Sequence, residues 1–347
     1  MDSTKTVIKK ETKNRISVDY EGKLSVKERL IKKLTTSNTW ITAVVNVFRF
    51  ILMLGVSYVI LFPFFSKVAG SFMNRFDVID ATVSLIPKSP TLEQYKYIIL
   101  DNRYFEAFLN TLFISVLCAL IQTFVACLIG YGLAKFKFKG NKIVMLIVVI
   151  TMIIPHSTLD FAMLRHFESF DIANIMSLGG TGILTKIFGK IDMINTFWPF
   201  IILSLGGLAF KNGLYIYMMR QFFKGVPDEL EESAYVDGSG TFRTFIQIIL
   251  PLSIPMMITI FLFAFSWQWT DQFYTGLFFI GTDAPWMMPD IISKIPLHLQ
   301  TNYAGKRLYE NVIQNTAGIM IIFPLVIMYL FCQRYLVQGI ERSGLVG

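Results

Sequence analysis

Long apolar runs are the feature that most constrains this sequence. Six of them, at residues 43–65, 105–133, 143–163, 196–219, 252–280 and 312–335, are long enough to cross a lipid bilayer, since a spanning helix takes about 20 mostly apolar residues. Inside lipid the backbone must satisfy its own hydrogen bonds, and runs of this length do so as helices. The sequence therefore predicts an all-α membrane protein with six transmembrane helices.

The composition excludes a soluble protein. Of the 347 residues, 16% are charged and 54% are hydrophobic, whereas a soluble domain carries roughly 25% charged residues. One soluble core could not bury so much apolar surface. The three histidines and three cysteines show neither metal-ligand spacing nor a paired nucleophile. We therefore expect no catalytic residues and no metal site.

Basic residues predict the orientation of the chain. The short link 135–142 contains four lysines and no acid, and such links stay on the cytoplasmic side. The basic N-terminal arm agrees, so six spans place both termini in the cytoplasm. The net charge of +8 is then explained by membrane topology, and no nucleic-acid partner is needed.

The sequence divides into four regions. We expect a basic cytoplasmic arm over 1–40, and the first transmembrane helix with an external loop over 41–104. A membrane core follows over 105–336, with a cytoplasmic loop at 220–250, and then a cytoplasmic tail over 337–347.

The loop between the fourth and fifth spans predicts two short helices. Pro227 suits the first position of a helix, and four acids between 228 and 232 favour its positive N-terminal end. Asp237 and Gly238 favour its end, because Gly tolerates a positive φ. Ser239 can cap a second helix, which Pro251 is expected to interrupt. The pattern predicts a helix–turn–helix at the cytoplasmic face.

This segment resembles the EAA signature of ABC importer permeases. In that family Glu-Ala-Ala is followed by three variable residues and a Gly, and about ten residues later by Ile-x-Leu-Pro. Here Glu232-Ser233-Ala234 precedes Gly238, and the run 248–251 reads Ile-Ile-Leu-Pro. Ser233 replaces the first Ala of the signature. The likeness is specific because spacing, composition and predicted location agree.

Other segments resemble carbohydrate-uptake permeases within this family. Residues 131–140 resemble their YALAR-F-x-F-x-G turn, and residues 218–223 resemble their LLRQFF run. The segment 334–340, RYLVQGI, is similar to the RYFVQGL of the smaller maltose-type permease subunit. The tail differs, with Val346 where the family has a basic residue.

The resemblance implies a fold, a function and partners. The fold would be that of a type I ABC importer permease in the cytoplasmic (inner or plasma) membrane of a prokaryote. The chain would move a carbohydrate, with an oligosaccharide as the leading candidate, by alternating access. Its partners would be a second homologous permease subunit, two ATP-binding subunits and an extracytoplasmic solute-binding protein. ATP and Mg would be bound by the ATPase partners, so this chain would need no cofactor and would not be an enzyme.

The resemblance also implies which residues meet the ATPase. A short coupling helix would dock in a cleft of one ATPase subunit, and the C-terminal tail would reach the ATPase pair. The implied coupling residues are Glu231, Glu232, Ser233, Ala234, Asp237, Gly238 and Ser239, and the implied tail contacts are Gln338 and Gly339.

Candidate substrate-path residues are aromatic or polar side chains within the apolar runs. Sugars pack on aromatic rings and bond through their hydroxyls. The aromatic residues could instead belong to an interfacial belt, and Lys211 could snorkel to the cytoplasmic face. The candidates are Trp267, Gln268, Trp269, Asp271, Lys211 and Asn315.

Two alternative functions stay open. The same importer architecture could carry a solute other than a sugar. An ATP-independent secondary transporter would belong to a different class. That class favours inverted repeats and buried carboxylate clusters, and the sequence shows neither.

Overall fold

The computed structural model describes residues 8–11, 17–20, 37–170, 191–293, 303 and 305–342. Most of the predicted arm, residues 171–190 between the third and fourth predicted spans, and the last five residues of the tail lie outside these ranges. The chain divides into two compact units, Met1–Ser66 and Lys67–Gly347.

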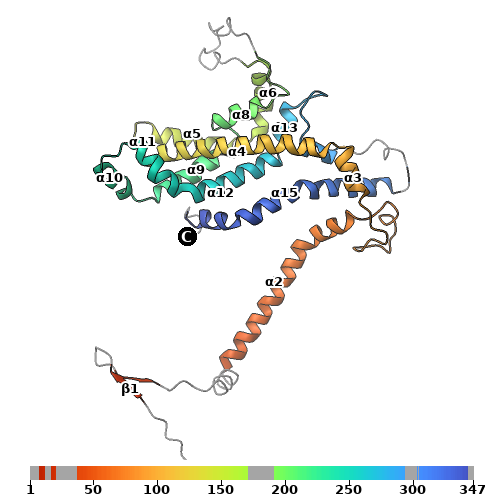
Figure 1. Cartoon of the computed structure of the whole chain (residues 1–347), viewed down its shortest axis with the longest axis horizontal. Helices are drawn as coiled ribbons and strands as arrows, with labels where there is room; N and C mark the ends of the chain where they lie inside the picture. Colours follow the sequence, from red (N-terminus) through yellow and green to blue (C-terminus); the bar gives the residue numbers. More distant parts are fainter. Residues whose placement is uncertain are drawn as a thin grey trace, which may run out of the picture. The chain divides into compact units, whose positions relative to one another are not determined.

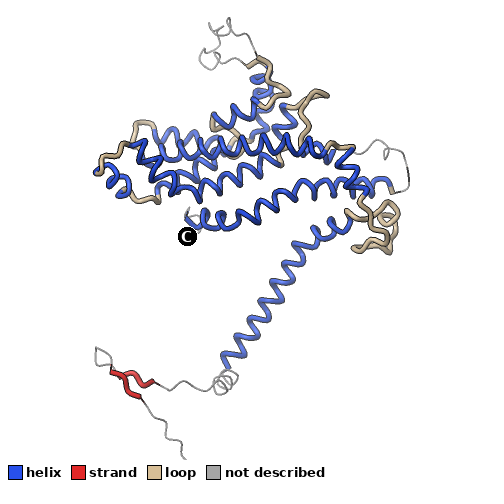
Figure 2. The backbone as a smooth tube through the Cα atoms, in the orientation of Figure 1, coloured by secondary structure: helices blue, strands red, loops and turns tan. Residues whose placement is uncertain are grey.

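The first unit contains a hairpin and most of a long helix. Strands β1 (Ile8–Glu11) and β2 (Ser17–Tyr20) pair antiparallel (Figure 2). Within the described residues this hairpin is the departure from the predicted all-α class. Helix α2 (Ser37–Gly70) contains the first predicted span, and its apolar side chains are exposed along the whole span. Apolar side chains on all faces are typical of a helix that contacts lipid.

Apart from an isolated β-bridge between Phe170 and Ile191, the elements described in the second unit are all helices, and they run as a bundle (Figure 1). In order they are α3 (Glu93–Leu100), α4 (Tyr104–Lys135), α5 (Asn141–Ile153), η1 (His156–Leu159), α6 (Asp160–Glu168), α8 (Trp198–Leu205), α9 (Asn212–Lys224), α10 (Glu229–Val236), α11 (Thr241–Thr244), η2 (Phe245–Ile249), α12 (Leu250–Trp269), α13 (Phe273–Phe278), α14 (Met288–Ser293) and α15 (Lys306–Arg342).

Helix α4 lies at the centre of the second unit. It packs along α9 and α12, and α12 packs in turn against α15 (Figure 1). The approach of α4 to α9 is close at Gly130, where a Cβ atom would lie 2.6 Å from the Cβ of Met219. Small residues allow such close helix packing inside membranes. Helix α9 is therefore held closely against α4.

The prediction of six spans is confirmed in part. Among the described residues, four helices are long and apolar enough to cross a membrane: Val44–Gly70, Tyr104–Lys135, Thr241–Trp269 and Lys306–Leu336. A fifth span arises if the bent pair Asn141–Ile153 and His156–Glu168 is counted as one. The chain is a multi-pass membrane protein.

The predicted third and fourth spans are both interrupted. The third bends by 95° between α5 and η1, because Pro155 disfavours the helical conformation of Ile154 and both residues are extended. The fourth separates into α8 and α9. Gly207, with φ +70°, and Lys211, with φ +66°, lie in the left-handed region at this break. A continuous span over 196–219 is therefore wrong.

The predicted interruption at Pro251 is also wrong. Residues Thr241–Trp269 form one helical stretch, and Pro251 lies in the first turn of α12 directly after the π-helical segment η2. A π-helical turn is wider and bonds to a more distant carbonyl, so it accommodates a residue that has no amide hydrogen. The predicted fifth span, 252–280, in contrast ends at Trp269.

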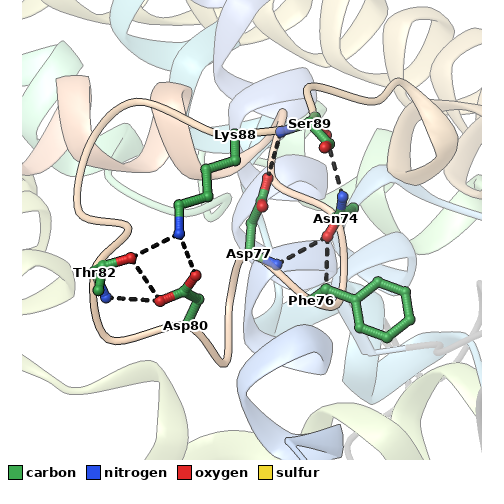
Figure 3. Close-up of polar contacts among 7 residues, drawn as sticks. All are labelled: Asn74, Phe76, Asp77, Asp80, Thr82, Lys88 and Ser89. Carbon is green, nitrogen blue, oxygen red and sulfur yellow. Dashed lines mark hydrogen bonds and ion pairs between the residues drawn. The ribbon is translucent and has the colours of Figure 1, made fainter.

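Hydrogen bonds and an ion pair between polar side chains hold the segment between α2 and α3 in place (Figure 3). Asn74 accepts hydrogen bonds from the amides of Phe76 and Asp77 through Oδ1, each at 2.8 Å, and donates to the Ser89 carbonyl. Asp80 forms an ion pair with Lys88. The hydrogen bond that the Lys88 ammonium group donates to Asp80 lowers the pKa of the Asp80 carboxyl below its ordinary value. The segment has a defined conformation that local polar contacts stabilise.

Candidate functional site

Helix α10 is the predicted short helix of the EAA-like segment. It follows Asp228, its N-cap residue, and ends at Asp237, so Pro227 precedes the helix instead of starting it. Gly238 has φ +82°. The Gly238 amide donates to Tyr235 O at 3.0 Å, and the Ser239 amide to Ala234 O at 2.9 Å. This pair of bonds is a Schellman motif, which ends a helix at a residue in the left-handed region.

The predicted cap at Ser239 is wrong. Gly240 is the N-cap residue of α11, and no side chain bonds to the first amides of that helix. The Ser239 hydroxyl instead accepts a hydrogen bond from Thr244 Oγ1 at 3.2 Å. Ser239 therefore stabilises the turn between α10 and α11 through a side-chain contact.

A buried polar cluster ties α10 to the end of α4. Tyr131 donates a hydrogen bond from its hydroxyl to Glu231 Oε1 at 2.5 Å. Lys135 Nζ lies 3.4 Å from Glu231 Oε2, and it also pairs with Asp228 and donates to the Val226 carbonyl at 2.6 Å. The Glu231 residue is only 7% exposed, so its carboxylate is satisfied within the chain.

Lys135 also changes the pKa of a neighbouring carboxyl group, that of Asp228. The hydrogen bond and the positive charge of Lys135 lower the pKa of Asp228 below its ordinary value. Tyr131 and Lys135 both come from the segment whose sequence resembles the YALAR turn. The cluster thus joins that segment to the EAA-like segment, about a hundred residues further along the chain.

The predicted coupling residues divide between two sides of α10. Glu231 and Ala234 are buried, and Ser239 is half-buried. The exposed members are Glu232, Ser233, Asp237 and Gly238. The helix therefore holds itself against its own chain with one side and presents the other side outward.

Two exposed apolar residues beside α10 escaped the sequence prediction. Val236 is 87% exposed and Phe242 is 75% exposed. They lie on either side of the turn at Gly238, within a segment that is otherwise polar. The sequence signal for them is a large apolar side chain within a polar loop. Such a residue tends to be exposed, and an exposed apolar patch marks a contact surface.

A second region lies where the third and fourth predicted spans are interrupted. A cavity of about 460 Å³ is lined by residues 151–157, by residues 207–214 and by Phe273. Both breaks in regular helix structure open onto it. Of the six substrate-path candidates, Lys211 lines this cavity directly.

Lys211 and Trp267 lie together at this second region. The Lys211 ammonium group is 5.0 Å from the centre of the Phe210 ring and 5.2 Å from that of the Trp267 ring. Cation–π attraction stabilises such an arrangement. Lys211 precedes the 13 residues of α9, which rise about 20 Å in a helix. That distance is too long for Lys211 to snorkel to the α10 side.

The other predicted path residues have structural partners elsewhere. Trp269 is fully buried and donates from Nε1 to Ile321 O at 2.9 Å. Asp271 caps α13 by accepting hydrogen bonds from the amides of residues 273–275. Asn315 accepts a hydrogen bond from Lys67. Gln268 is nearly buried, and its side-chain nitrogen has no partner among the described residues.

The C-terminal candidates Gln338 and Gly339 both lie in the last turns of α15. Over the parts of the chain that the structure describes, no group of three or more histidine, cysteine or acidic residues could hold a metal ion.

The sequence matches a known family over residues 122–342, which includes both regions. The family is described as "Binding-protein-dependent transport system inner membrane component". The chain belongs to this family. The resemblance seen in the EAA-like segment is thereby confirmed, and the chain is a membrane permease component of a transport system and not itself an enzyme.

Individual relatives match nearly the whole chain. The polygalacturonan/rhamnogalacturonan transport system permease protein YtcP of Bacillus subtilis (strain 168) is 24% identical over 308 residues, which cover 87% of this chain and 97% of that protein. The probable starch degradation products transport system permease protein AmyC of Thermoanaerobacterium thermosulfurigenes is 29% identical over 282 residues, covering 80% and 89%.

Solved structures show the same fold. A chain of a bacterial ABC transporter involved in the import of the acidic polysaccharide alginate superimposes with a TM-score of 0.65 at 20% identity, covering 86% of this chain and 98% of that one. A chain of the alginate transporter in complex with an alginate pentasaccharide-bound periplasmic protein gives a TM-score of 0.57 at 18% identity, covering 84% and 94%. The fold is that of a type I importer permease.

Proposed function

We propose that this chain is one of two permease subunits of an ATP-driven importer that moves an oligosaccharide across the cytoplasmic membrane of a prokaryote. The observation that carries the proposal is the likeness, over nearly the whole chain, to permeases named for polygalacturonan/rhamnogalacturonan and for starch degradation products. The alternative of a non-sugar solute has no such support.

The chain would cross the membrane six times, with both termini in the cytoplasm. In this topology the bent third segment and the broken fourth segment each count as one span. The arm 1–40, the loop 220–250 and the tail 337–347 would be cytoplasmic, and 41–104 would supply the first span and an external loop. The four-lysine link 135–142 supports this orientation.

The exposed side of α10 would dock on one of two ATP-binding subunits. Glu232, Ser233, Asp237 and Gly238 would meet that subunit, together with the exposed Val236 and Phe242, and Gln338 and Gly339 would add a second contact. ATP and Mg would be bound by those subunits. Glu231 and Ala234 would act as positioning residues, because both are buried against this chain.

The buried cluster at Glu231 suggests how force would be transmitted. Closure of the ATPase pair would displace α10, and the contacts of Glu231 with Tyr131 and Lys135 would carry the displacement to α4. Since α4 packs along α9 and α12, the bundle would rotate as a rigid body between two states. Differential contacts in those states are what couple ATP to transport.

An extracytoplasmic solute-binding protein would deliver the substrate. One structural neighbour was solved with a periplasmic protein bound. The polar loop between α2 and α3 is a candidate contact surface, because it has a defined conformation (Figure 3) and presents Ile86, which is 84% exposed. A second, homologous permease would complete the pathway.

Reconstitution tests this function. The chain would be copurified with its permease and ATPase partners and placed in proteoliposomes with the solute-binding protein. We expect ATP-dependent uptake of an oligosaccharide from a panel, and ATP hydrolysis that rises when binding protein and sugar are added. Uptake that needs no ATP would instead identify a secondary transporter, and uptake of other solutes alone would exclude the sugar.

A further inference from the structure

The cavity between the two broken spans contains a cation without a carboxylate partner. Lys211 forms no ion pair with any residue that the structure describes, and its ammonium group lies over the rings of Phe210 and Trp267. An ionisable group within a membrane-spanning region is costly and usually serves a function. A side chain that lines the cavity therefore offers a positive charge to something outside this chain.

A second, independent observation concerns the residue that follows. Asn212 is fully buried and lines the same cavity. Neither its side-chain nitrogen nor its side-chain oxygen has a hydrogen-bond partner among the described residues. A buried amide with no partner is destabilising, and natural proteins rarely tolerate one without a purpose. A bound ligand with polar groups would satisfy it.

Both residues lie at the N-terminal end of α9, a helix of 13 residues. This end of a helix carries a partial positive charge and favours anions. Half-helices that begin inside a membrane at a substrate cavity direct this charge toward anionic groups of the substrate. The lysine and the helix end thus favour an anionic ligand, and the amide can bind a neutral polar group of the same ligand.

The remaining walls fit a sugar ring. Phe210 lines the cavity. The exposed Trp267 ring is not part of the lining but packs against the Phe210 ring, with ring centres 5.2 Å apart. The His156 side chain, held by a 2.7 Å hydrogen bond to the Tyr274 hydroxyl, lies 4.9 Å from the Phe210 ring. The cavity volume of about 460 Å³ falls within the range of roughly 300–1,000 Å³ for small-molecule sites.

We propose that this cavity binds a carboxylate-bearing sugar unit, a uronic acid, of the transported saccharide. Lys211 and the N-terminal end of α9 bind the carboxylate, Asn212 exchanges hydrogen bonds with a ring hydroxyl, and Phe210 contacts the apolar face of the ring. Trp267 supports the Phe210 ring from outside the cavity lining. This inference rests on the proposed function, since it presumes that the transported solute is a saccharide.

Binding to the complete transporter tests the inference. Both permeases and both ATPase subunits are assembled in nanodiscs, without the solute-binding protein, and titrated with two probes. One probe is α-1,4-linked trigalacturonate, and the other is its fully methyl-esterified, neutral form. Because a hydrogen bond to a charged group is lost with the ester, we expect trigalacturonate to bind at least about tenfold more tightly.

Variants assign the preference to Lys211. The Lys211→Gln complex should bind both probes equally, and Lys211→Arg should retain most of the preference. Lys224→Gln, at the other end of α9 and exposed, is the matched control and should behave as wild type. Asn212→Ala should weaken the binding of both probes, since it removes a contact to hydroxyl groups that both share.

Three results with these purified complexes overturn the inference, and two uptake results would do so as well. The first three are equal binding of the two probes by the wild type, an equal loss of both in Lys211→Gln, and loss of the second permease from the Lys211→Gln complex. The last would mean that Lys211 pairs with that subunit. ATP-driven uptake of neutral oligosaccharides alone would overturn the inference and leave the proposed function intact. Uptake of no saccharide, charged or neutral, would overturn both.

Discussion

Helix α9 joins two regions that differ in whether their polar groups have partners within the chain. Beyond its C-terminal end, the carboxylate of Glu231 is buried against Tyr131 and Lys135 of the same chain. At its N-terminal end, Lys211 lies over two aromatic rings with no ion-pair partner among the described residues, and the side-chain amide of Asn212 has no described hydrogen-bond partner. Satisfied buried networks make a structure rigid, whereas unsatisfied groups are available to a ligand. On our proposals, the first region transmits force and the second binds the ligand.

The largest effect is expected at the turn after α10. Gly238→Asp should abolish uptake and weaken copurification of the ATPase while membrane insertion continues. Gly238 has φ +82°, which other L-residues rarely adopt, and its exposed surface would contact the ATPase. Uptake, copurification and membrane insertion are measured on the same preparations.

Gly240→Ala is the control for that substitution. Gly240 has φ −78° and open space around it, so an added methyl group should be tolerated. Full transport and normal ATPase copurification by Gly238→Asp would contradict the assignment of α10 as the coupling helix.

A large effect is also expected when the buried cluster loses its carboxylate. Glu231→Ala leaves the Tyr131 hydroxyl without its acceptor and removes one of the partners of the buried Lys135. The expected loss is roughly 2–4 kcal/mol of stability. Transport should fall more than basal ATP hydrolysis, because the connection from α10 to α4 is broken. Thermal unfolding of the purified complex and the ratio of uptake to hydrolysis measure this.

Glu232→Ala provides the comparison on the same helix. Its side chain is exposed, so stability should change by no more than about 0.5 kcal/mol. Equal destabilisation by the two substitutions would remove the distinction between the inner and outer sides of α10.

An intermediate effect is expected from the packing of α4 on α9. Gly130→Ala places a Cβ atom 2.6 Å from the Cβ of Met219 and 2.9 Å from the amide nitrogen of Arg220. Such overpacking costs about 1–3 kcal/mol. Gly132→Ala, two residues away on the same helix, meets nothing within 4 Å and should leave the unfolding temperature unchanged or slightly raised. Similar unfolding temperatures for both variants would mean that the two helices separate easily here.

The smallest effect concerns the pH dependence of the pair between Asp228 and Lys135. Lys135 lowers the pKa of the Asp228 carboxyl, so the pair stabilises the folded state fully above the unfolded pKa of about 4. The contribution is lost as the pH falls through the lower pKa of the folded state. Asp228→Asn should remove this part of the acid dependence and change little at pH 7. Unfolding temperatures of the wild type and of Asp228→Asn, measured between pH 3 and pH 7, test this expectation. An equal fall in both as the pH is lowered would contradict it.

Sequence reasoning succeeded where structure depends on neighbouring residues. The long apolar runs correspond to α2, α4 and α15, and the Asp237-Gly238 pair does end α10. It failed at the breaks, because a run stays apolar whether or not its helix is continuous. The 95° bend after Ile153 and the left-handed Lys211 therefore went unpredicted.

Side-chain environment was harder to predict than helix position. Glu231 and Glu232 are adjacent acids with the same local sequence signals, yet Glu231 is buried and Glu232 is exposed. The difference arises from Tyr131 and Lys135, whose positions in the chain are about a hundred residues away. The exposure of Val236 and the burial of Asn212, whose side chain has no partner among the described residues, also depend on distant contacts and were missed for that reason.

The sequence by itself determined the class of this protein, its long helices, its family and the place of α10, because apolar length, glycine and helix-end chemistry act over a few residues. Only the tertiary structure decided which charges are internally satisfied and which are left for a ligand. Those assignments depend on contacts between α4 and α10, and on the meeting of two interrupted spans at one cavity. Neither contact has a local signal, because each is formed by residues that are distant in the chain.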